Sequence, residues 1–179
     1  MDSISRFVEK KLRLRVNRRK SAADYVERRK FLGYRLSRKG QLYMAPESLK
    51  RAKARIRQIT RRNRGVSLER VIRELNIFLG GWVTYYRYAR CRGHLQHLDQ
   101  WLRRKLRCYR LKQRKRSKAI AEFLQQNGVP EWRAWILALS GKGWWRKAGS
   151  PQACEAMPIK WFEKLGLLNL THRYLALNN

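Results

Sequence analysis

Acidic residues are scarce in this sequence: 12 Asp and Glu stand against 44 Lys and Arg, which gives a formal net charge of +32 over 179 residues. The only aspartates are Asp2, Asp24 and Asp99, and no two acidic residues suggest a metal-binding pair. Two-metal phosphoryl chemistry needs clustered carboxylates, and the three histidines show no nucleophile–base arrangement. We therefore expect no catalytic residues and no enzymatic activity of this chain on its own.

Cysteine and long apolar runs are also lacking. The three cysteines are an odd, sparse set, which favours reduced intracellular thiols over a disulfide framework. No apolar run approaches the ~18–20 residues that a spanning helix needs, and the first residues lack the apolar core and cleavage site of a secretory signal. We expect a cytoplasmic protein with no membrane partner.

A metal site has one weak candidate. Cys91, His94 and His97 are spaced by three, and Cys108 is the only nearby fourth ligand. A zinc site needs three or four converging ligands. The favoured interpretation is ordinary polar residues in a loop and helix start, so we expect no metal and no cofactor.

Positive charge is concentrated in the first two-thirds of the chain. The net charge is +17 for residues 1–64, +12 for residues 65–118 and only +3 for residues 119–179. The chain is 44% apolar and holds 20 aromatic residues, so it is no disordered basic tail. The partner is a polyanion: RNA, DNA or an anionic membrane surface. Nucleic acid is favoured, because the helices need their apolar faces for one another rather than for a membrane.

The N-terminal third combines one helix with a hairpin. Residues 3–14 predict a short amphipathic helix ending near Val16. Residues 31–36 and 41–44 predict two strands, with Gly40 at the turn. A hairpin alone is marginal in water, so we expect it to pack on a neighbouring element.

Two helices follow. The first begins after Pro46 and stops near Gly65, and its apolar stripe comprises Leu49, Ala52, Ile56 and Ile59. The second begins at a Ser67 cap and keeps an apolar phase for nearly five turns. Gly80 and Gly81 interrupt this helix, which predicts close packing there.

A third helix holds the most basic stretch, WLRRKLRCYRLKQRKR (101–116), with nine Lys and Arg and no acid. Leu residues and Tyr109 line one face. Arginines at i, i+4, i+7 and i+11 line the opposite face, and guanidinium groups suit phosphate. The leucines are Leu95, Leu98, Leu102 and Leu106, and the predicted arginine ridge is Arg103, Arg107, Arg110 and Arg114.

The last third is a helical tail. A helix ending at Asn127–Gly128 and another starting at Pro130 precede a glycine-bracketed loop that displays Trp144 to Lys147. Its tryptophans could stack on unpaired bases or fill the core, and the sequence favours neither. The fold class is therefore mainly α: a small N-terminal α/β remnant with a hairpin (1–44), an antiparallel three-helix bundle (45–118) and a helical tail (119–179).

Nucleic-acid contact is predicted for the basic stretches of the bundle and for the tryptophan-containing loop. On the second helix, Trp82 and Tyr86 are expected in the core, while Tyr85 and Arg87 face the partner. The predicted RNA-binding residues are Lys50, Arg51, Lys53, Arg55, Arg57, Arg61, Arg62, Arg64, Arg103, Arg104, Arg107, Arg110, Arg114, Lys115, Arg116, Trp144, Trp145, Arg146 and Lys147.

Several blocks resemble the C-terminal part of bacterial group II intron reverse transcriptase/maturases. These are LRLRVNRRKSAADYVERRKFLGYRL, RGVSLERVIRELNIFLGGWVTYYRYA, LDQWLRRKLRCYRLKQRKR and GVPEWRAWILALSGKGWWRKAGSP, in this order. The resemblance implies the end of a polymerase palm at 1–44, a thumb-like bundle at 45–118 and a maturase-specific tail at 119–179. Members of this family bind their intron RNA, promote its splicing and copy it into DNA as mobile elements.

The chain departs from the family, because the fingers, most of the palm and the Tyr-x-Asp-Asp motif are absent from this sequence. The resemblance therefore implies an RNA-binding maturase module that supports splicing of a group II intron RNA, in a bacterial cytoplasm. Three alternatives remain open. The chain is the thumb half of a split reverse transcriptase that needs a separate fingers–palm chain, an inactive truncated remnant, or a general DNA-binding basic protein.

Overall fold

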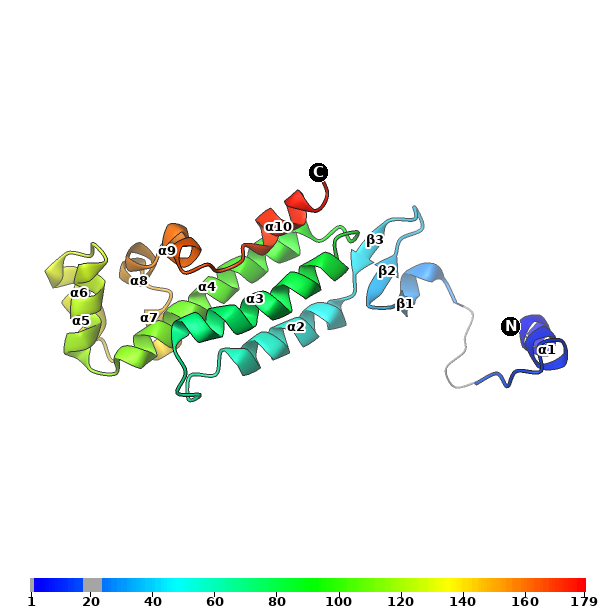
Figure 1. Ribbon diagram of the computed structural model, residues 1–179, viewed down its shortest axis with the longest axis horizontal. Coiled ribbons are helices and arrows are strands. Elements are labelled where there is room, and N and C mark those ends of the chain that lie inside the picture. Colours follow the sequence, from blue (N-terminus) through cyan, green and yellow to red (C-terminus); the bar gives the residue numbers. More distant parts are fainter. Residues whose placement is uncertain (1, 18–23) are drawn as a thin grey trace.

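The computed structural model describes residues 2–17 and 24–179 (Figure 1). Its N-terminal part holds a helix, a short 3₁₀ helix at Val26–Arg28 and a small sheet, and helices make up nearly everything after them, so the mainly α class is confirmed. The elements are α1 (Asp2–Lys10), β1 (Lys30–Phe31), β2 (Tyr34–Leu36), β3 (Leu42–Met44), α2 (Pro46–Ile59), α3 (Leu68–Tyr85), α4 (Arg92–Arg114), α5 (Ser117–Gln126), α6 (Glu131–Leu139), α7 (Trp144–Lys147), α8 (Pro151–Ala156), α9 (Ile159–Lys164) and α10 (Leu170–Ala176).

The predicted hairpin is confirmed, with one additional strand. β2 and β3 pair antiparallel, with Tyr34 opposite Met44. The predicted strand at 31–36 is interrupted, because the chain turns at Leu32 and Gly33, both of which have positive φ. This turn folds the short β1 back onto β2 and makes a three-stranded antiparallel sheet. The sheet packs against the end of α3, where the Tyr85 hydroxyl donates to the Leu32 carbonyl at 2.7 Å.

The first helix is shorter than predicted. α1 ends at Lys10 and buries none of its residues, and Leu12 and Leu14 after it are exposed. An amphipathic sequence without a surface to cover gains little from further turns, because most helix stability in proteins comes from packing.

The three-helix bundle is observed, with α2, α3 and α4 side by side (Figure 1). Ser67 caps α3 as predicted, since its side chain accepts a hydrogen bond from the Arg70 N–H at 3.2 Å. α2 stops earlier than predicted: the Thr60 hydroxyl bonds to the Ile56 carbonyl, and Gly65 instead lies in the following loop at φ +68. The expected close packing at Gly80 and Gly81 is wrong, because nothing lies within 4 Å of a Cβ built at either residue.

The core runs without a break from the bundle into the tail. Leu95, Leu102 and Leu106 of α4 belong to the same buried cluster as Phe123 of α5 and Phe162 of α9. The turn at Asn127–Gly128 ends α5 as predicted, with Gly128 at φ +89. In Figure 1 the helices α5 to α9 gather toward the C-terminal end of α4, and α10 lies near the opposite end. Over the described ranges, no helix is long and apolar enough to cross a membrane.

Candidate nucleic-acid interface

The surface of helix α4 is divided into three stripes of residues with different surroundings. The predicted leucine face is confirmed, and Leu95, Leu98, Leu102 and Leu106 are fully buried in the bundle. A second stripe, the four predicted arginines, faces the tail. A third stripe contains Trp101, Lys105, Cys108 and Lys112, again at i, i+4, i+7 and i+11, and it borders a cleft.

This cleft, which we call the basic cleft, lies between the C-terminal end of α2, the middle of α4 and the short helix α7. Two adjoining cavities form it, of about 690 Å³ and about 470 Å³, and they share Thr60, Arg62, Lys105 and Trp144. No acidic residue is among the residues that line these two cavities. The full lining is Arg57, Thr60, Arg61, Arg62, Asn63, Lys105, Cys108, Lys112, Gly143, Trp144, Trp145 and Arg146.

The cations of the basic cleft lie close enough to affect one another, and no acidic residue is among the described residues that line it. The pKa of Lys105 is lowered, first by burial and further by the positive charges of Arg57 and Arg62. Arg62 also donates a weak hydrogen bond to the Cys108 sulfur at 3.6 Å. A bound phosphate would relieve the repulsion among these groups, as expected of an anion site.

Tryptophan rings hold the cations of the cleft in place. The Trp101 ring of α4 lies within 6 Å of Lys53 and Arg57 of α2, and of its own neighbour Lys105. Cations at this distance from an indole face are attracted by its quadrupole. Trp101 therefore links α2 to α4 beside Arg57 and Lys105, the two of these cations that line the cleft.

The arginine stripe of α4 is not the open ridge that we predicted. Arg107 donates two hydrogen bonds to the Met157 carbonyl, at 3.0 and 2.8 Å, and lies over the Phe162 ring. Arg110 and Arg114 both lie over the Phe123 ring of α5, at 5.3 and 4.8 Å from its centre. The tail folds back over this side of α4, so all four arginines, Arg103 included, are only partly exposed.

Residues 144–147, which we predicted to form an exposed loop, also have a different structure. Residues 144–147 form the helix α7, and Lys147 points inward, is 8% exposed and donates to the Ala138 carbonyl at 3.1 Å. Burial lowers the pKa of Lys147. Trp144 packs against the core, whereas Trp145 is 40% exposed and Arg146 is exposed, so the segment contributes two accessible residues rather than four.

Arg64 and Arg104 are engaged in hydrogen bonds with other segments of the chain. Arg64 pairs with Glu74 at 2.8 Å and donates to the Ile59 carbonyl, which fixes the loop between α2 and α3. Arg104 donates twice to the Trp145 carbonyl and so attaches α7 to α4. These contacts leave less of each guanidinium available to a ligand than the sequence predicted.

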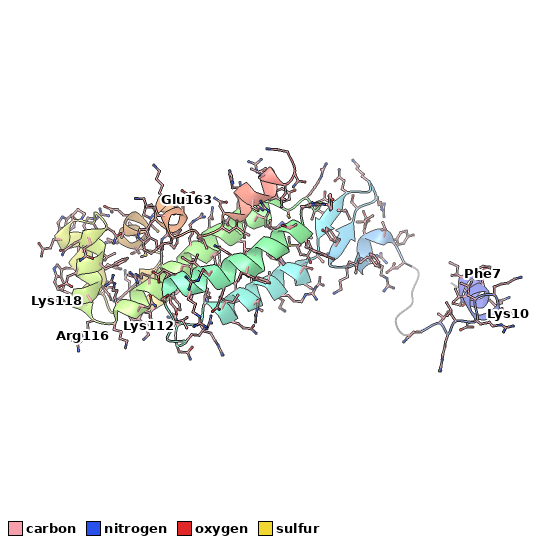
Figure 2. All side chains as sticks on the ribbon, in the orientation of Figure 1. Phe7, Lys10, Lys112, Arg116, Lys118 and Glu163 are labelled. Atoms are coloured by element: carbon pink, nitrogen blue, oxygen red, sulfur yellow. The ribbon has the colours of Figure 1, made fainter. Side chains whose placement is uncertain are left out.

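The remaining predicted residues extend the basic cleft along the outer face of α2. Lys50, Arg51 and Arg55 of α2 are exposed and Lys53 is partly buried, while Arg57 of α2 and Arg61 and Arg62 just after it are exposed in the lining of the cleft itself. Lys115 and Arg116 are exposed just beyond the end of α4. Figure 2 shows Lys112, Arg116 and Lys118 along one edge of the molecule, while Glu163 on α9 lies at the opposite edge.

Sequence reasoning missed the third stripe of α4, because it treated the helix as having only an apolar face and an arginine face. Lys105 and Lys112 were therefore not predicted to bind. The signal was present in the sequence, since Trp101, Lys105, Cys108 and Lys112 have the same spacing as the arginine stripe.

The aromatic residues at the end of α3 form part of the fold. Tyr86 is buried as predicted, and Trp82 packs against the core cluster. Tyr85 is half-exposed, but its hydroxyl bonds to Leu32 and its ring contacts Tyr34. Tyr85 therefore supports the sheet, whatever else it contacts.

The zinc candidate does not assemble. Cys91 is buried, and burial raises its pKa to about 11, whereas His94 and His97 are exposed. Among the residues that the structure describes, no three His, Cys, Asp or Glu side chains come together as a metal site.

Comparison with known proteins gives one match. No curated protein matches the chain. Residues 49–128 match the family model of the group II intron maturase-specific domain. This segment contains most of α2 and all of α3, α4 and α5, and with them two of the three walls of the basic cleft. The resemblance found in the sequence is thus confirmed over residues 49–128, which are similar to the maturase-specific domain of group II introns.

Proposed function

We propose that this protein binds group II intron RNA in the basic cleft and supports splicing of that RNA. The observation that carries the proposal is the lining of the cleft, where cations of α2, α4 and α7 meet two tryptophans and no acid. The maturase-specific domain in the same part of the chain supports intron RNA as the partner.

The mechanism is neutralisation of RNA phosphates. Each contact releases counterions, so affinity depends steeply on salt. The cleft and the outer face of α2 would hold two backbone segments of a folded RNA near each other and so favour its compact state. Phosphate contacts position the RNA without reading its sequence. We further propose that this chain supplies no chemistry of its own to the reaction.

The first test is competition for the purified chain at ~0.2 M salt, because non-specific affinity falls steeply at this ionic strength. A labelled, folded group II intron RNA competes with an unrelated structured RNA and with duplex DNA. Preference for the intron RNA supports the proposal. Equal, salt-sensitive binding to all three would contradict it and would favour a general basic protein or an inactive remnant.

A second test removes charge from the cleft. Arg61, Arg62 and Arg146 are exposed cleft residues, and changing all three to Gln should weaken intron RNA binding at least tenfold. The slope of log affinity against log salt should fall by about 2–3, since each phosphate contact contributes about 0.7–0.9.

The matched control removes three exposed cations from the far side of the molecule. Changing Lys160, Lys164 and Arg173 of α9 and α10 to Gln lowers the net charge by the same amount. This control should weaken binding less than threefold. Equal losses in the two triple variants would show that net charge, and not the cleft, binds the RNA.

A second candidate function is supported by the N-terminal sheet. β1 is a two-residue edge strand, and its Phe31 and the following Leu32 are 73% and 68% exposed. Exposed apolar groups on an unpaired edge suit the addition of another chain. We propose, as the alternative, that this edge docks on a separately encoded fingers–palm chain. Co-purification of such a chain would support it, and loss of that chain on Phe31→Lys would locate the contact.

A further inference from the structure

Trp145 has a different environment from the other residues of the basic cleft. It is 40% exposed, lines the larger cavity and lies under Arg104, whose guanidinium carbon is 4.4 Å from the ring centre. Arg104 also donates to the Trp145 backbone carbonyl through Nε and Nη2, at 3.3 and 3.0 Å. Arg104 therefore contacts both the backbone carbonyl and the indole ring of Trp145, and these contacts fix the position of the ring.

Gly149 leaves the room that this arrangement needs. A Cβ built at Gly149 would lie 2.6 Å from the guanidinium carbon of Arg104 and 2.6 Å from its Nη2. Any other residue at this position would push the guanidinium away from Trp145. Because the group that must move is the end of a flexible side chain, the fold can accommodate the change.

Cations suited to a phosphate lie next to this ring. Lys105 Nζ is 6.0 Å from the centre of the Trp145 ring, and Arg62 lines the same cavity. The cavity of about 690 Å³ is within the ~300–1,000 Å³ of pockets that hold small organic ligands. A nucleotide offers a planar base and a phosphate that are separated by one ribose, which matches a ring and a cation at this spacing.

We propose that the basic cleft accepts one unpaired nucleotide of the bound RNA, with its base stacked on Trp145 and its phosphate against Lys105 and Arg62. This inference rests on the proposed RNA-binding function and specifies its ligand. A continuous duplex offers phosphates but no free base plane, so it would leave Trp145 unused. Arg104 and Gly149 are positioning residues, since they act through the orientation of Trp145.

The test compares two RNA hairpins at ~0.2 M salt that differ only by a single bulged adenosine. Base–aromatic stacking contributes ~1–3 kcal/mol, so the protein should bind the bulged hairpin roughly tenfold more tightly. Trp145→Ala should bring the two affinities to within twofold while the affinity for the paired hairpin changes less than threefold. Trp132→Ala, at a 68% exposed tryptophan on α6, is the matched control and should keep the preference.

A second variant leaves the indole in place. Gly149→Ala should displace Arg104 and reduce the preference for the bulge by about threefold, with thermal unfolding close to that of the wild type. A bulged 5-iodouridine irradiated on the wild-type protein should crosslink to Trp145, which avoids any question of variant folding.

Equal binding of the two hairpins by the wild type, or a crosslink outside the basic cleft, would overturn the inference. Equal loss of both affinities in Trp145→Ala would do so as well. Failure of the proposed function has a separate signature, because it appears as a lack of preference for intron RNA over duplex DNA in the competition.

Discussion

The carboxylate of Asp99 on α4 caps the start of α10 through Thr171. Asp99 Oδ2 accepts hydrogen bonds from the backbone N–H of Thr171 at 3.0 Å and from its hydroxyl at 2.7 Å. Asp99 Oδ1 accepts the N–H of Leu170 at 3.0 Å. One of the few aspartates of the chain is therefore used to attach the tail to the bundle.

Asp99→Ala should detach α10 and lower the free energy of unfolding by about 1–3 kcal/mol, because buried N–H groups lose their acceptor. Chemical denaturation measures this change, and limited proteolysis should show earlier cleavage near residue 170. Asp24→Ala is the control, since the described contacts of Asp24 are surface ones, two ion pairs with Arg28 and Arg29 and a hydrogen bond from the adjacent Tyr25 N–H, and it should stay within about 0.5 kcal/mol. Equal stability of the two variants would rule out the capping role.

Arg107→Gln separates folding from binding. Loss of its two hydrogen bonds to Met157 and its contact with Phe162 should lower the free energy of unfolding by about 1–3 kcal/mol. Affinity for RNA, measured where the variant is folded, should change less than threefold, because this arginine faces the tail rather than the cleft. A tenfold loss of affinity with unchanged stability would restore the arginine ridge that the sequence suggested.

Binding should weaken at alkaline pH through Lys105. Burial and the charges of Arg57 and Arg62 lower its pKa, whereas a bound phosphate favours the charged form and raises it again. RNA binding is therefore coupled to proton uptake, and affinity falls as the pH rises through the lowered pKa, below the ~10.4 of an ordinary lysine.

The stability of the folded protein should depend on pH in the opposite direction to the RNA affinity. The folded state holds the Lys105 proton less tightly than the unfolded state, so this residue disfavours folding at neutral pH and disfavours it less as the pH rises. Lys105→Arg keeps its charge, so at fixed salt its RNA affinity should fall less than that of the wild type as the pH rises from 7 toward the ~10.4 of an ordinary lysine. Parallel pH profiles for the two proteins would exclude Lys105 as the coupled group.

Gly33 and Gly40 offer a matched pair in the sheet. Both have positive φ, so alanine is strained by roughly 1–2 kcal/mol at either residue. Only at Gly33 would the new Cβ also clash, with the hydroxyls of Tyr86 and Ser48, whereas nothing lies within 4 Å at Gly40. Gly33→Ala should therefore destabilise the protein clearly more than Gly40→Ala in thermal unfolding. The reverse order would mean that Gly33 does not lie against Tyr86 and Ser48.

The sequence predicted the features that depend on local pattern. The periodic leucines of α4, the Ser67 cap and the Asn127–Gly128 stop were all recognisable, because each is fixed by residues a few positions apart. The turn at Leu32 was missed, since it depends on a glycine whose space is set by Tyr86, far along the chain. The exposed arginine ridge was wrong for a similar reason: nothing in the spacing of Arg107 shows that Met157 will cover it.

In the candidate site, too, some residues could be predicted from the sequence and others depend on contacts between distant segments. The basic residues of α2 could be identified as a binding surface from charge alone, and that assignment stays a prediction. The inward position of Lys147 and the place of Lys105 in the cleft could not be identified, because both depend on how the tail folds against α4. The direction in which a basic side chain points depends on the elements that pack around it, and the sequence alone does not show that packing.

The third wall of the basic cleft, α7, begins at Trp144, beyond residue 128, where the match to the maturase-specific domain ends. A partly folded chain retains every positive charge and would still attract any polyanion. Only a chain whose tail has docked on α4 has the complete cleft in which we propose that one unpaired nucleotide is bound. Attraction is thus a property of the composition, whereas discrimination depends on the native state and would disappear first when the protein begins to unfold.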